Sequence, residues 1–408
     1  MKWFDGGVTS PSGFRAGSTR TGLKKQGMDL TVVECPGTAS CAALFTQNAV
    51  KAAPVLVSME NLGVSGGRIR AVVINSGNAN ACNGKRGLED ARRVIREASA
   101  LLEVEPEEVL VSSTGVIGRP LEVERVLSGL RKVIPSLSGS REAGENASRA
   151  IMTTDTVPKE AAVGIEIEGR EIVIAGMAKG AGMIHPNLAT MICVVTTDAA
   201  VDPGDLREIT ERAAGKSFNM ITIDNDQSTN DMLLIMASGA SGSPRIRRGE
   251  VSYGLFEEAL TELCIRLARG LVSDAEGASK CFEVVVRGAA SADDANAVAL
   301  AVAGSNLVKS AIFGSDPNWG RIVAAAGYSG AKLDPDALGI SLSTGSRSME
   351  WVRDGCQVSE EKNEEARGFF SGEDFSIVLE MGLGEHEARS WGCDLSYEYV
   401  RINSEYTS

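Results

Sequence analysis

Short apolar runs rich in β-branched residues alternate along this chain with segments of helical periodicity, and this alternation constrains the fold more than any other feature. The runs have the length and composition of buried strands. The expected strands are residues 29–35, 70–77, 108–114, 170–177, 190–197, 231–239, 281–288 and 375–382. The expected helices are residues 87–102, 121–134 and 291–306, the last opening on a capping box of Ser291 and Asp294. Strands and helices mixed in this order predict an α/β or α+β fold.

No Pro- or Ser-rich linker and no fixed-period repeat divides the chain. Its 408 residues are enough for two domains or for one large domain with a substantial core. Near residue 190 there is no change of composition that would mark a domain boundary.

Charge and cysteine usage narrow the class of protein. Lys and Arg number 41 against 54 Asp and Glu, and the net charge of −13 argues against a nucleic-acid surface. The eight cysteines are scattered without a C-x-x-C pair, and the N-terminus lacks the apolar core of a signal peptide. No stretch approaches the ~18 apolar residues of a membrane helix. We therefore expect reduced thiols, no membrane span and a cytoplasmic location.

Several familiar motifs fail on inspection. Residues 75–87 have the wrong glycine spacing for a phosphate-binding loop, and residues 224–231 lack the central Gly of a calcium loop. The only histidines are His185, in a loop before proline, and His386, among charged residues. A His-rich metal site is thus close to excluded, no metal is expected, and ordinary loop and surface roles fit both histidines.

Thr190 stands where a Gly-rich approach meets an apolar run, in "KGAGMIHPNLATMICVV". A threonine can act as a nucleophile without histidine if its own α-amino group is free to serve as the base. That amine has a pKa of about 7.7–8.0, whereas a peptide nitrogen has no usable basicity. The residue would gain this amine if its hydroxyl attacked the Ala189 carbonyl and the resulting ester were hydrolysed. Taken alone, a threonine at the start of a strand is more often present only because β-branched residues favour strands.

Three other segments could complete such a site. In "VSSTGVIG" a strand is expected to end in a turn, where Thr114 and Gly115 could donate to an oxyanion. Lys179 lies among glycines and could hold a carboxylate, and Glu276 precedes a strand and could meet an ammonium group. Each feature by itself is also compatible with a helix cap or an ordinary loop charge.

Taken together, many segments in order resemble one family, over essentially the whole chain from Gly6 to Ser408. These are "GGVTSPSGFRA", "FTQNAVKAAPV", "VINSGNANACNG", "SSTGVIG", "MTTDT", "KGAGMIHPNLATMI", "DPNWGRI" and "WGCDLSYEYVRINSEY". They resemble the ornithine acetyltransferase (glutamate N-acetyltransferase) family of arginine biosynthesis.

The resemblance implies self-cleavage between Ala189 and Thr190. The products would be an α chain of residues 1–189 and a β chain of residues 190–408, folded together. The family assembly is an α2β2 heterotetramer, and the family fold has sheets sandwiched between helical layers.

The resemblance also implies a reaction: acetyl transfer from N-acetylornithine to glutamate by a ping-pong route through acetyl-Thr190. Thr114 and Gly115 would form the oxyanion hole. The residues that would contact substrate are Thr153, Lys179, Thr190, Glu276, Asn403 and Ser408. Thr153 could be exchanged for Thr154 or Thr156. No cofactor is implied, and the sequence leaves open whether acetyl-CoA is a second acetyl donor.

Two departures from the family pattern and two rival functions remain. Ser408 stands where the family often ends in threonine and keeps the hydroxyl, and Cys41 occupies a stretch that is often Ala/Gly-rich in the family, where we expect a buried thiol.

One rival is a self-cleaving amidohydrolase or aminopeptidase that passes the acyl group to water. The other is an amino-acid-binding protein that never cleaves.

Overall fold

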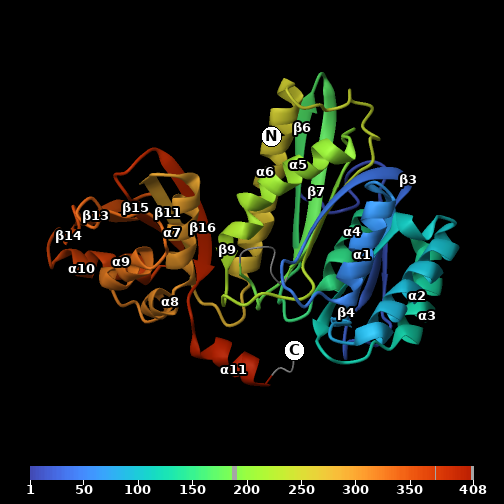
Figure 1. Ribbon diagram of the computed structural model, residues 1–408, viewed down its shortest axis with the longest axis horizontal. Coiled ribbons are helices and arrows are strands. Elements are labelled where there is room, and N and C mark those ends of the chain that lie inside the picture. Colours follow the sequence, from blue (N-terminus) through green and yellow to red (C-terminus); the bar gives the residue numbers. More distant parts are fainter. Residues whose placement is uncertain (186–190, 373, 406–408) are drawn as a thin grey trace.

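The computed structural model describes residues 1–185, 191–372 and 374–405 (Figure 1). Within these residues the strands form a large sheet of nine and a small sheet of seven. The large sheet contains β1 (Lys2–Phe4), β2 (Arg15–Thr19), β3 (Leu30–Phe45), β4 (Arg68–Asn78), β5 (Val109–Val116), β6 (Lys159–Ile167), β7 (Arg170–Lys179), β8 (Ile192–Thr197) and β10 (Met232–Ala237). The small sheet contains β9 (Ile221–Thr222), β11 (Cys281–Ala289), β12 (Gly339–Ser343), β13 (Ser348–Arg353), β14 (Cys356–Gln357), β15 (Asp374–Glu380) and β16 (His386–Cys393).

The large sheet interleaves distant parts of the chain. Its order is β1-β6-β7-β8-β10-β3-β4-β5, with β2 paired to β3. β8 runs antiparallel to β7 and parallel to β10, and β10 runs antiparallel to β3. The two strands that follow residue 190 therefore lie between strands that precede it.

Helices cover both faces of the large sheet. They are α1 (Ala53–Val64), α2 (Gly84–Leu102), α3 (Val123–Val133), α4 (Arg141–Ile151), α5 (Pro203–Gly215) and α6 (Val251–Ser273). On one face Ile151 of α4 belongs to the same apolar cluster as Val33 and Val72. On the other, α1, α2 and α3 cover one half of the sheet and α5 and α6 the other half. Alternate strand residues pack on opposite faces, which explains the continuous apolar runs in the sequence.

The small sheet carries the remaining core helices. They are α7 (Ala292–Gly304), α8 (Asn306–Phe313), α9 (Trp319–Gly327) and α10 (Lys362–Phe370). Phe282 of β11 stacks with Phe375 of β15, which stacks in turn with Phe370 of α10. The last helix, α11 (Tyr397–Glu405), extends below the two sheets in Figure 1, and all of its residues are described and none is buried.

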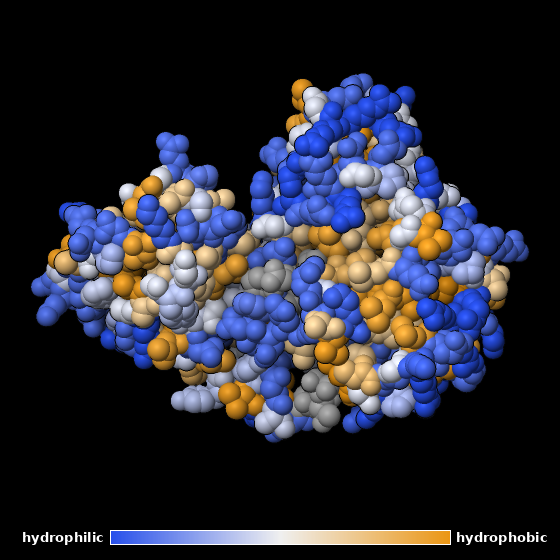
Figure 2. Space-filling model, in the orientation of Figure 1, coloured by the Kyte–Doolittle hydropathy of each residue, from blue (hydrophilic) through white to orange (hydrophobic). Residues whose placement is uncertain are grey.

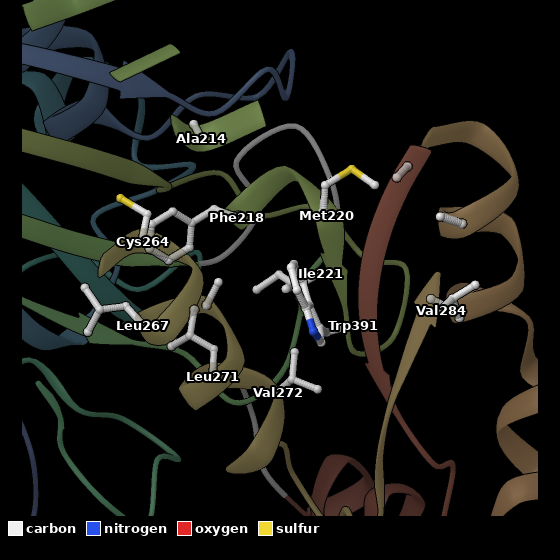
Figure 3. Close-up of a cluster of buried hydrophobic side chains, with 14 of the residues drawn as sticks. Ala214, Phe218, Met220, Ile221, Cys264, Leu267, Leu271, Val272, Val284 and Trp391 are labelled. Carbon is white, nitrogen blue, oxygen red and sulfur yellow. The ribbon is translucent and has the colours of Figure 1, made fainter. Parts of the chain in front are cut away.

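An apolar joint connects the two sheets (Figure 3). Leu271 and Val272 of α6 point toward Ile221 of β9 and Trp391 of β16, and all of them are buried. β9 is hydrogen-bonded to β16, so a segment that follows α5 forms part of the small sheet. The joint makes one continuous core of both sheets, and it places the end of α6 between them.

The mixed α/β class is confirmed, and each expected strand and helix is present with changed bounds. β3 is much longer than expected, and β8 begins at Ile192, so the strand starts two residues later than expected. Half of the expected capping box forms at α7: the Ser291 side chain accepts from the Asp294 N–H, but the Asp294 carboxylate accepts from the Ser291 hydroxyl instead of the Ser291 backbone N–H. The eight cysteines are all described and are free thiols, with Cys41 buried as expected.

Surface polarity varies along the molecule. Figure 2 shows hydrophobic residues gathered over α1, where Leu56, Met59 and Val64 are exposed.

Within the described residues no single helix has both the length and the apolar character to cross a membrane. The pair α7 and α8 meets that test together, by length and composition, but is bent by 51°.

Candidate functional site

A cavity of about 70 Å³ gathers residues from seven separate parts of the chain. Six of the residues proposed from the sequence line it: Thr114, Gly115, Thr153, Lys179, Glu276 and Asn403. The other lining residues that the structure describes are Ala79, Ile117, Thr154, Gly182, Met183, Ser228 and Asn230. Residues separated by almost 300 positions in the sequence thus share one small polar space.

Thr114 and Gly115 form one wall, but their local structure differs from the expectation. They lie inside β5 and not in a turn before a helix, since the next helix begins at Val123. Gly115 has a φ of +127°, and β5 pairs irregularly with β4 at Gly77 and Asn78. Only glycine adopts this backbone readily, and it re-aims the peptide groups at the end of the strand. The strand itself, locally distorted, therefore presents the Thr114 hydroxyl to the cavity.

Lys179, the last residue of β7, brings a cation into the cavity. Its side chain is buried, and its ammonium donates a hydrogen bond of 3.2 Å to the Thr114 hydroxyl oxygen. Burial lowers the pKa of Lys179, and the carboxylates of Asp155, Asp231 and Glu276 oppose that shift. Because Thr114 accepts from the ammonium, its own hydroxyl proton stays available for donation, and the adjacent charge strengthens it as a donor.

The loop between α4 and β6 supplies a third wall and separates the three candidate threonines. Thr153 and Thr154 line the cavity, and the Thr153 N–H donates to Asp155 at 2.9 Å. Thr156 instead bonds to Asp274 through both its N–H and its hydroxyl. The geometry thus favours Thr153 or Thr154 over Thr156 as a substrate contact.

Glu276 and Asn403 complete the cavity from the opposite side. Glu276 lies in the loop between α6 and β11, where its N–H donates to Ala181 at 2.8 Å. Its carboxylate accepts a bond of 2.9 Å from the Asn403 side chain of α11. Gly182 allows this approach, since a Cβ there would lie 2.5 Å from the Glu276 carboxylate. The C-terminal helix is therefore held to the cavity by a polar contact.

Ala189, Thr190 and Ser408 lie outside the described residues, so their proposed roles stay predictions. Described residues on both sides of Thr190 are firmly held. Met191 is buried, and its carbonyl accepts from the Met232 N–H at 3.0 Å. On the other side, the Asp224 carboxylate accepts from the N–H groups of Met183 and Ile184, the latter at 2.9 Å.

Sequence reasoning missed part of the site. Asn230, just before β10, is buried and donates to the carbonyls of Ala79 and Ser113 at 2.7 and 2.9 Å. It thereby ties β10 to the ends of β4 and β5. The segment "DNDQSTND" (224–231) carries a signal for it, because five amide and hydroxyl side chains stand there directly before a buried strand.

A second cleft and the two histidines lie apart from this cavity. A larger cleft of about 720 Å³ between α6 and the small sheet contains none of the proposed site residues. Among the described residues, no group of three or more His, Cys, Asp or Glu side chains could hold a metal ion. His185 is half-buried beside Thr222, and His386 is exposed at the start of β16.

The cavity combines a buried ammonium, a carboxylate and hydroxyl donors in a space suited to a small zwitterion. An anion is favoured beside Lys179, and a cation beside Glu276. Such a pocket in a mixed α/β fold indicates the class of protein: one that binds a small amino-acid-like ligand.

Comparison with known proteins identifies the family. The ArgJ family model matches residues 15–408. A protein of Symbiobacterium thermophilum named arginine biosynthesis bifunctional protein ArgJ is 46% identical over 100% of both chains. A protein of Methanocaldococcus jannaschii named glutamate N-acetyltransferase is 44% identical, also over 100% of both chains. A crystal structure of ornithine acetyltransferase complexed with ornithine from Mycobacterium tuberculosis is 40% identical, covers 45% of this chain and 97% of that chain, and has a TM-score of 0.42. The chain belongs to the ArgJ family.

Proposed function

We propose that this protein transfers an acetyl group from N2-acetyl-L-ornithine to L-glutamate, giving ornithine and N-acetylglutamate. The observation that carries the proposal is the single cavity lined by Thr114, Gly115, Lys179, Glu276 and Asn403. The names of the full-length relatives support the same activity.

The proposed reaction needs a free N-terminal threonine. Self-cleavage between Ala189 and Thr190 would give the α chain of residues 1–189 and the β chain of residues 190–408. The Thr190 hydroxyl would then attack the acetyl carbonyl while its own α-amine takes the hydroxyl proton. The carbon–nitrogen bond of the donor breaks, the proton passes to the leaving amine, and ornithine departs. The amine of glutamate then attacks the acetyl ester and restores Thr190.

Each cavity residue has a role in this proposal. The negative charge on the acetyl oxygen would be stabilised by Thr114 and Gly115. Lys179 would hold the substrate α-carboxylate, and Glu276, with Asn403, the ornithine ammonium. Thr153 or Thr154 and Ser408 would complete the substrate contacts. One small cavity can serve both substrates in turn, because ornithine leaves before glutamate enters.

The proposal extends to three further points. The relatives named bifunctional support acetyl-CoA as a second acetyl donor, with no other cofactor. We propose an assembly of two α and two β chains, which follows the family resemblance. We also propose a cytoplasmic location, which fits the free thiols of all eight described cysteines.

The first experiment is an intact-mass spectrum of freshly purified protein under denaturing conditions. Two chains that meet at Ala189 and Thr190 are expected, and Thr190→Ala should leave one chain and no activity. Thr190→Ser should keep part of both. An active but uncleaved Thr190→Ala protein would refute the mechanism.

The second experiment measures the acetyl acceptor. Acetyl release from N-acetylornithine should depend on glutamate; release to water at the same rate without glutamate would favour a hydrolase. Lys179→Met should raise the KM for both substrates. Lys216→Met is the matched control, because Lys216 is exposed at the end of α5, away from the cavity.

A further inference from the structure

Three buried ionised side chains form a cluster behind the cavity, here called the ion triad: Asp155, Lys159 and Asp274. The Lys159 ammonium donates to Asp155 and to Asp274, each at 2.5 Å. Their side chains are only 0%, 4% and 7% exposed for Asp155, Lys159 and Asp274. Buried charges are costly unless each is paired and hydrogen-bonded, so a cluster like this needs a reason beyond stability.

Each arm of the ion triad reaches a different wall of the cavity. Asp155 accepts hydrogen bonds from the N–H groups of Thr153, at 2.9 Å, and Gly180, at 2.7 Å. Gly180 directly follows Lys179 at the end of β7. Asp274 stands two residues before Glu276 and follows the last residue of α6. Three walls that come from separate parts of the chain are thus joined at one buried point.

The charges of this region also balance. The ion triad carries one positive and two negative charges, and Lys179 supplies a second positive charge close to Asp155. Burial alone would raise the pKa of Asp155, but Lys179, Lys159 and the Gly180 N–H together lower it to about 2. Asp155 is therefore ionised throughout the physiological range, and Lys179 has a permanent anionic neighbour.

We propose that Asp155 is a positioning residue for the acetyl transfer: through Thr153, Gly180 and the ion triad it fixes the cavity walls relative to one another. The inference rests on the function proposed above and assigns part of it to a residue outside the cavity lining. Asp155 holds the Thr153 and Gly180 backbones from behind.

The arrangement has an electrostatic consequence that a purely structural role would lack. Lys179 must stay protonated to hold a carboxylate, and burial works against this. The titratable groups around Lys179 are Asp155, Asp231, Glu276, Lys159 and Lys24, and burial raises the pKa of Asp231 well above its usual range. Asp155 is the first of the carboxylates that oppose the effect of burial, so its loss should lower the pKa of Lys179 further.

The test is the pH profile of kcat/KM for N-acetylornithine, measured on the processed protein with glutamate as acceptor. Asp155→Asn should lower kcat/KM by roughly 10- to 100-fold, because Asn keeps only one of the two oxygens that accept from Thr153 and Gly180 and loses the charge that pairs with Lys159. On the alkaline limb of the profile, where kcat/KM falls as Lys179 loses its proton, the midpoint should move down by on the order of one pH unit. Asp155→Glu keeps the charge on a longer side chain, so it should lower the rate and leave the limb near its original pH.

Asp274→Asn is the matched control. It removes an equivalent charge from the ion triad, but the carboxylate that acts most strongly on the pKa of Lys179 is Asp155. The alkaline limb of Asp274→Asn should therefore move much less than that of Asp155→Asn. An unmoved limb in Asp155→Asn, or an equal movement in Asp274→Asn, would overturn the inference. Wild-type protein without acetyl transfer would instead refute the proposed function, so the two failures are distinguishable.

Discussion

Gly115 offers the sharpest test of the cavity geometry, because the structure sets the size of the effect. A Cβ at this position would lie 2.6 Å from the Asn78 nitrogen and 2.7 Å from the Gly77 Cα, both backbone atoms of the neighbouring strand. The φ of +127° is strained for any other residue. The strain costs about 1–3 kcal/mol, and the overlap with a backbone that cannot rotate away costs about 1–3 kcal/mol more.

Gly118 is a matched control three residues away. Its φ is also positive, at +78°, but a Cβ there meets nothing within 4 Å. Gly118→Ala should therefore cost only the backbone strain, about 1–2 kcal/mol. The two variants should differ by about 2 kcal/mol in the free energy of unfolding. At roughly 2–4 °C per kcal/mol, Gly115→Ala should melt about 4–8 °C below Gly118→Ala.

Differential scanning calorimetry of both variants measures this difference, and acetyl-transfer assays give a second readout. Gly115→Ala should also lose most activity, because Thr114 shares the displaced peptide, whereas Gly118→Ala should keep it. Equal melting temperatures would show that β4 and β5 are not packed as closely as described, and the argument from Gly115 to the oxyanion hole would then fail.

Three other predictions follow from the same contacts. Asn403→Ala should raise the KM for N-acetylornithine with little change in melting temperature, because α11 buries none of its residues; a large drop in melting temperature would contradict this. Asp155 has a pKa lowered to about 2, so its contribution to stability is present above the unfolded pKa of about 3.9 and is lost as the pH falls toward 2. The melting gap between wild type and Asp155→Asn should therefore narrow between pH ~4 and ~2, and a gap that widens would reverse the assigned sign. An alkylating reagent should label Cys82 and Cys356 in the native protein and spare the buried thiols, as peptide mapping would show; rapid labelling of Cys41 would indicate an opening of the core.

The sequence predicted the strands and helices whose pattern is local. The buried strands are near-continuous apolar runs, and the capping box of α7 is a short-range signal. The second half of β3 was not predictable in this way. Five of its nine residues after Pro36 are Gly, Ala or Ser, which have little strand propensity, and it extends because β10 pairs with it.

The site could be predicted in part for a similar reason. Lys179, Glu276 and the Thr114–Gly115 pair stand in segments with a recognisable pattern, and the cavity brings them together. Asp155 and Asn230 serve the cavity through backbone groups of distant residues. Nothing in a local pattern shows which carbonyl or N–H a buried side chain will meet, so their positions had to come from the structure.

The order of strands in the large sheet bears on when the proposed cleavage before Thr190 could occur. β8 and β10 stand at its centre, flanked by β7 and β3 from the earlier half of the chain. An isolated segment ending before residue 190 would have a sheet missing its two middle strands, with the apolar surface of β7 and β3 unpartnered. Such a fragment would aggregate before it could pair with the rest of the chain. A break between β7 and β8 is therefore harmless only after the sheet has closed. Two separately expressed halves should fail to reconstitute what one continuous chain assembles.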